Sequence, residues 1–147
     1  SRGSKIRVVN VEALINGIHF ATYKGDGIVI ATATGSTAYS LSLGGAILSP
    51  SINNMIMKPI AAHTSLMGGL VIEKDVVISL KASSNEDLSI SVDGFIDNKI
   101  EDFDQIDVEI DKENKAFFIR SENFQDLYWS SLAQKLDLRK GDSLSGK

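Results

Sequence analysis

The chain has 147 residues, of which 43% are hydrophobic and 23% are charged, and its net charge at pH 7 is −4. This length and composition predict one globular domain with its own hydrophobic core. The acidic balance argues against nucleic acid as a partner, because proteins that bind phosphate backbones usually carry a basic surface.

The composition excludes further classes of protein. Because cysteine is absent, neither disulfides nor thiolate metal sites can form. No apolar run reaches the ~20 residues that cross a bilayer, and the first residues lack the hydrophobic region of a signal peptide. We therefore expect a cytoplasmic protein that does not bind membranes.

The chain begins with Ser1 rather than Met, which predicts that it is a piece of a longer protein. We expect residues 1–4 to be a linker or a cloning remnant. Residues 5–139 then form the domain, and residues 140–147 form a flexible tail rich in glycine, serine and lysine.

The first predicted elements form a hairpin. Residues 7–15 and residues 18–23 are rich in apolar residues and flank Asn16-Gly17, a pair typical of two-residue hairpin turns because both positions need a positive φ. Residues 25–27, with the sequence Gly-Asp-Gly, predict the next turn, and residues 28–32 predict the next strand.

A Thr-Gly-Ser-Thr turn at residues 34–37 leads into a predicted short helix over residues 36–43, which Gly44 ends. Free N–H groups at the start of a helix, beside the hydroxyls of Thr34, Ser36 and Thr37, suit a polar or anionic ligand. The same hydroxyls can instead cap only their own helix. The residues alone leave both interpretations open.

The remainder of the chain predicts strands and one terminal helix. The short apolar blocks are residues 55–62, 70–72, 76–80, 88–92, 106–110 and 116–119. Each block is too short for a helix, and several alternate apolar with polar residues. Residues 124–138 predict an amphipathic helix that caps the sheets. The expected fold class is therefore all-β, a β-sandwich-like double sheet with a short helix after the Thr-Gly-Ser-Thr loop and a C-terminal helix.

Residues 25–45 closely resemble the signature of the NAD kinases, in which Asp-Gly, an apolar strand, Thr-Pro-Thr-Gly-Ser-Thr-Ala-Tyr-Ser and Gly-Gly follow one another. The matching residues are Asp26-Gly27, Thr32, residues 34–40 and Gly44-Gly45. Later segments of the family are matched by Pro59-Ile60, His63, residues 91–94 and residues 131–136. The resemblance covers residues 9–138 and implies the NAD-binding C-terminal domain of the two-domain fold shared by NAD kinases and diacylglycerol kinases.

The resemblance also implies an activity. NAD kinases phosphorylate the 2′-hydroxyl of the adenosine ribose of NAD to give NADP, using Mg²⁺ and ATP or polyphosphate, and they are homo-oligomers, commonly dimers or tetramers. Their N-terminal α/β domain carries Gly-Gly-Asp-Gly-Thr, which this sequence lacks. We therefore expect the chain to be inactive as a kinase by itself, with no catalytic residue and no metal ligand assigned in it.

Site residues are carried over by position. From the sequence alone, Asp26 is more often a turn residue that bonds its own backbone. Tyr39 offers an aromatic face to a base or nicotinamide ring and a hydroxyl for orientation. In the family, the segment with Ala61 and His63 reaches the dinucleotide site, sometimes from a neighbouring subunit. The NAD-binding residues implied by the resemblance are Asp26, Thr34, Ser36, Thr37, Ala38, Tyr39, Ala61, His63 and Asp93.

Some positions depart from the family. Ala33 replaces the usual proline, two alanines at 61–62 stand where Cys-Pro is common, and two glycines at 68–69 replace Arg-Pro. These departures motivate an alternative function, a non-catalytic nucleotide-binding or assembly module derived from the same fold. Lipid kinases such as diacylglycerol or sphingosine kinases are a third option, but they lack Thr-Gly-Ser-Thr-Ala-Tyr.

Overall fold

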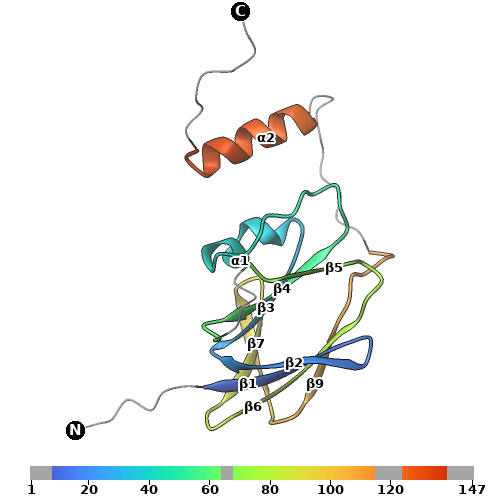
Figure 1. Cartoon of the computed structure of the whole chain (residues 1–147), viewed down its shortest axis with the longest axis vertical. Coiled ribbons are helices and arrows are strands. Elements are labelled where there is room, and N and C mark those ends of the chain that lie inside the picture. Colours follow the sequence, from blue (N-terminus) through green and yellow to red (C-terminus); the bar gives the residue numbers. More distant parts are fainter. Residues whose placement is uncertain (1–7, 64–67, 115–123, 139–147) are drawn as a thin grey trace, which may run out of the picture. The chain divides into compact units, whose positions relative to one another are not determined.

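The computed structural model describes residues 8–63, 68–114 and 124–138 (Figure 1). The chain divides into two compact units, residues 1–111 and residues 112–147. In the described part of the chain the strands belong to the first unit. They are β1 (Val9–Ile15), β2 (Ile18–Gly25), β3 (Gly27–Thr32), β4 (Met55–Ile60), β5 (Leu70–Ile72), β6 (Ile78–Ser84), β7 (Leu88–Val92), β8 (Phe95–Ile100) and β9 (Gln105–Val108).

The strands form three antiparallel sheets, which confirms the all-β prediction. The largest sheet has the order β2-β1-β6-β9, the second has the order β3-β4-β5, and β7 pairs with β8. Alternate residues such as Val11 and Ala13 of β1 enter the same buried cluster as Met55 and Met57 of β4. One hydrophobic core is therefore shared by the two larger sheets, as the alternating pattern requires.

The turns between strands follow the local chemistry of the sequence. The β1–β2 hairpin turns at Asn16 and Gly17 with φ values of 49° and 78°, as predicted. A similar turn at Asp93 and Gly94, with φ values of 51° and 75°, joins β7 to β8. Strand β8 was not predicted, because its residues do not alternate clearly between apolar and polar side chains.

The helix predicted over residues 36–43 is wrong in one respect, because it is two separate pieces. A 3-10 turn, η1 (Gly35–Thr37), is followed by a single α-helical turn, α1 (Tyr39–Ser42), with a break at Ala38. The Thr37 hydroxyl donates a hydrogen bond to the Thr34 carbonyl, three residues earlier, which favours the tighter turn. Gly44 ends the segment with φ of +79°, as expected.

The second unit contains the helix α2 (Phe124–Lys135), which confirms the terminal helix. The predicted strand over residues 116–119 lies outside the described residues. No helix among residues 8–63, 68–114 and 124–138 combines the length and the apolar character needed to span a bilayer.

The corner between β2 and β3 depends on a glycine. A Cβ atom on Gly25 would lie 2.5 Å from the Ile60 carbonyl oxygen and 3.0 Å from the Ala62 Cα atom. We predict that Gly25→Ala lowers the free energy of unfolding by about 1–3 kcal/mol, because the backbone must shift to admit the methyl group. Urea denaturation measures this loss. Gly68→Ala is the control, since a Cβ there meets no atom within 4 Å, and equal stability of the two variants would contradict the prediction.

Candidate functional site

The segment after β3 presents one exposed surface, which we call the loop face. It consists of Thr34, Thr37, Ala38 and Tyr39, which are all solvent-exposed, and the Tyr39 side chain is 59% exposed. Tyr39 lies in α1, and Thr37 closes η1. The loop face therefore places two threonine hydroxyls and an aromatic ring on six consecutive residues of the predicted motif, 34–39.

Ser36 lies on the other side of the same segment. Its side chain is 0% exposed, and its hydroxyl donates a hydrogen bond of 2.6 Å to the Ala33 carbonyl and accepts one of 2.9 Å from the Leu48 N–H. Both partners, Ala33 and Leu48, belong to a small buried apolar cluster with Ile56. Unlike its neighbours in the motif, Ser36 turns its polar atom into the fold.

Residues 44–48 follow α1, and we call them the return segment. The Gly45 N–H donates to the Ser40 carbonyl at 2.8 Å, and the Ala46 N–H donates to the Gly68 carbonyl at 3.2 Å. A Cβ atom on Gly45 would collide with the Ser40 hydroxyl and lie 2.7 Å from the Ser40 carbonyl oxygen. The second glycine of the motif is therefore required by close backbone approach, a role that no local pattern predicts.

A second group of predicted residues lies at the corners that follow β2 and β4, and we call it the corner group. It consists of Asp26, Ala61 and His63, which are all exposed. The Asp26 N–H donates to the Ile60 carbonyl at 2.9 Å, and Gly27 pairs with Ile60 in the antiparallel ladder. Ala61 has a φ of 50°, the left-handed geometry of a tight corner.

The loop face and the corner group lie at opposite ends of β3. Gly27 and Thr32 are the first and last residues of this strand, so the two groups are separated by about 17 Å at ~3.4 Å per residue. Figure 1 shows the α1 segment at one end of the sheet that contains β3 and β4. The nine predicted site residues therefore do not form a single cluster within one chain.

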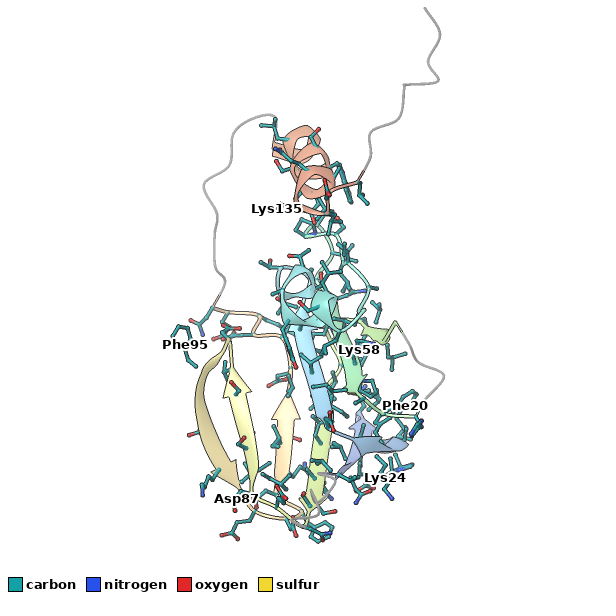
Figure 2. All side chains as sticks on the ribbon, turned by 90° about the vertical axis from the view of Figure 1, so that its left-hand side faces the viewer. Phe20, Lys24, Lys58, Asp87, Phe95 and Lys135 are labelled. Carbon is teal, nitrogen blue, oxygen red and sulfur yellow. The ribbon has the colours of Figure 1, made fainter. Side chains whose placement is uncertain are left out.

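Asp93 lies apart from both groups, in the exposed turn between β7 and β8. Figure 2 shows Phe95 beside this turn, at the end of the hairpin, and its side chain is 76% exposed.

The chemistry of these groups is suited to binding. Among the described residues, no three His, Asp or Glu side chains are placed to hold a metal ion. The Asp107 pKa is lowered by hydrogen bonds from Ser79 and Gln105, and burial raises the Tyr23 pKa, but both residues lie in the sheet β2-β1-β6-β9, outside the loop face and the corner group. Hydroxyls, one carboxylate, one imidazole and an aromatic ring remain, all of which can hold a polar, planar ligand.

Comparison with known families gives a direct match. Residues 1–121 match the model of the ATP-NAD kinase C-terminal domain. An NAD kinase of Caldanaerobacter subterraneus subsp. tengcongensis is 37% identical over 137 residues, covering 92% of this chain and 48% of that protein. An NAD kinase of Dehalococcoides mccartyi is 34% identical, covering 92% and 47% respectively. The chain thus spans about half the length of these relatives.

Solved structures share the fold. Yeast NADH kinase in complex with NADH superposes with a TM-score of 0.78 at 26% identity, covering 99% of this chain and 42% of that chain. An NAD kinase from Archaeoglobus fulgidus in complex with ATP gives a TM-score of 0.70 at 22% identity, covering 89% and 51%. The three-sheet arrangement is therefore that of known NAD and NADH kinase domains.

The close approach at Gly45 generates a test of the return segment. We predict that Gly45→Ala lowers the free energy of unfolding by about 1–3 kcal/mol. Adding Ser40→Ala should restore part of this loss, since it removes the colliding hydroxyl but leaves the Ser40 carbonyl. Denaturation in urea provides the three stabilities. If Gly45→Ala unfolds at the same denaturant concentration as the unmodified chain, the close approach does not contribute to the free energy of unfolding.

Proposed function

The chain belongs to the family of ATP-NAD kinase C-terminal domains, and from this premise we propose that it is the NAD-binding part of an enzyme that phosphorylates the 2′-hydroxyl of the adenosine ribose of NAD to give NADP. The observation that carries the proposal is the loop face, in which the family motif presents its hydroxyls and tyrosine to solvent. The yeast neighbour was solved with NADH, which supports a pyridine nucleotide as the ligand.

Three exposed groups of the two surfaces can bond to a dinucleotide. The hydroxyls of Thr34 and Tyr39 make no hydrogen bond within the described part of the chain, so both are available to ribose or phosphate oxygens. The Tyr39 ring can stack on a base. The Asp26 carboxylate can accept hydrogen bonds from a ribose hydroxyl or from a carboxamide N–H group.

The chemical step needs groups beyond this chain. Phosphoryl transfer depends on positioning and on neutralising charge, and the described residues offer no donor cluster for a metal ion. We propose that Mg²⁺ and the phosphoryl donor, ATP or polyphosphate, bind to the other half of the protein, where the metal neutralises phosphate charge. The contribution of this chain is to bind the acceptor nucleotide and orient its 2′-hydroxyl.

We further propose that complete sites form between copies of the protein in a dimer or tetramer. The separation of about 17 Å along β3 prevents one small chemical group from touching both surfaces. A neighbouring copy can place its corner group beside the loop face of the first, as the resemblance to the NAD kinases implies. Symmetric homo-oligomers repeat such a contact at every equivalent site.

The loop face is tested by removing one hydroxyl. We predict that Thr37→Val raises the Kd for NAD roughly 5- to 15-fold, the equivalent of one lost hydrogen bond. Calorimetric titration of the full-length protein measures the Kd, and NADP formation from NAD and ATP measures the activity. Thr22→Val, on the exposed part of β2, is the matched control and should bind NAD normally.

The outcomes separate the candidate functions. A full-length protein that binds no pyridine nucleotide and makes no NADP contradicts the proposal. Tight binding of NAD without NADP formation would favour the non-catalytic module instead.

Mixing two variants tests the site between copies. Asp26→Asn in the corner group and Thr37→Val in the loop face each weaken NAD binding when every copy carries the change. In randomly mixed dimers, roughly a quarter of the sites should combine two unmodified surfaces. Unfolding and refolding the variants together should therefore restore high-affinity binding at that fraction of the sites. If no high-affinity NAD sites are recovered, both surfaces act within one copy.

A further inference from the structure

Two serines of the motif are buried four residues apart, and they differ in their bonding. Ser36 is 0% exposed and Ser40 is 1% exposed. The Ser36 hydroxyl makes two hydrogen bonds, whereas the Ser40 hydroxyl has no hydrogen-bond partner among the described residues. Of these two buried hydroxyls, only that of Ser36 has the hydrogen bonds that buried polar groups normally make.

The connection made by Ser36 is long in sequence. Its hydroxyl joins the Ala33 carbonyl at the start of the turn to the Leu48 N–H at the end of the return segment, 12 residues further on. Ser36 is fully buried, and both of its partners belong to a buried apolar cluster, so water does not reach this connection. If Ser36 lost its hydroxyl, the Leu48 N–H would be buried without an acceptor, and this would lower the stability of the segment.

We propose that Ser36 is a positioning residue: its hydroxyl locks the segment so that Thr34, Thr37, Ala38 and Tyr39 are held ready for the nucleotide, and it does not contact the nucleotide itself. This inference rests on the proposed function. A segment that is fixed before binding pays less conformational entropy when the ligand arrives. When the binding-competent conformation is only partly populated, the apparent Kd rises in proportion.

The first experiment needs no ligand. Hydrogen exchange of the Leu48 amide in the full-length protein reports whether its acceptor is present, because local opening controls exchange of a buried amide. Ser36→Ala should accelerate this exchange at least ~10-fold. Ser40→Ala is the matched control, since it makes the same substitution at an equally buried serine without removing a hydrogen bond, and it should leave the Leu48 exchange unchanged.

The second experiment measures NAD binding by the same variants. Ser36→Ala should raise the Kd and KM for NAD roughly tenfold while kcat changes less, because the loss falls on the population of the competent conformation. Ser40→Ala should change neither the Kd nor the KM for NAD. If Ser36→Ala does not fold, Ser36→Cys replaces it, since a thiol has a similar size but is a weaker donor and acceptor. Its effects should have the same direction.

Taken together, the two experiments separate positioning from direct contact. A higher Kd for NAD in Ser36→Ala without faster Leu48 exchange would mean that the hydroxyl contacts the ligand instead of holding the segment, and this would overturn the proposal. Normal NAD binding despite faster Leu48 exchange would also overturn it.

Failure of the proposed function has a different signature. In that case the unmodified protein would not bind NAD, which would overturn both the proposed function and the positioning role. The Leu48 exchange would still distinguish Ser36→Ala from Ser40→Ala. A protein that binds NAD but shows no effect of Ser36→Ala overturns only the present inference.

Discussion

The buried Ser36 hydroxyl joins the two ends of the segment that carries the candidate site, through the Ala33 carbonyl and the Leu48 N–H. Because this segment contains only a 3-10 turn and one α-helical turn, helical hydrogen bonds alone cannot hold it rigidly. Its shape instead depends on the hydrogen bond from Leu48 of the return segment to Ser36 and on the apolar cluster of Ala33 and Leu48 with Ile56 of β4. The arrangement of the exposed loop face therefore follows from what is buried behind it.

Glycines supply the second constraint, at points where the backbone passes close to itself. Gly25 lies against the Ile60 carbonyl, and Gly45 lies against Ser40. At both places a side chain would occupy the space of a backbone atom. The first contact lies at the corner that carries Asp26, and the second holds the return segment against Ser40 of α1. Each of the two surfaces proposed to bind nucleotide is thus next to a glycine that close backbone approach requires.

The chain belongs to the ATP-NAD kinase C-terminal domain family, and its two exposed surfaces are the candidate binding groups. The chain spans about half the length of its relatives, and the chemistry proposed for the whole protein divides between the two halves. The proposed separation of nucleotide binding from phosphoryl activation agrees with the exposure of both surfaces.

The sequence by itself determined the all-β class, the Asn16-Gly17 hairpin and the family, because these depend on local turn chemistry, on alternating side chains and on a long motif. It also placed Thr37 and Tyr39 in the candidate site. Only the tertiary structure decided that Ser36 points inward, that Gly45 is needed for packing, and that Asp26 lies at the far end of β3 from the loop face. The physical reason is that burial and separation arise from contacts between distant segments, such as Ser36 with Leu48, which no local pattern encodes.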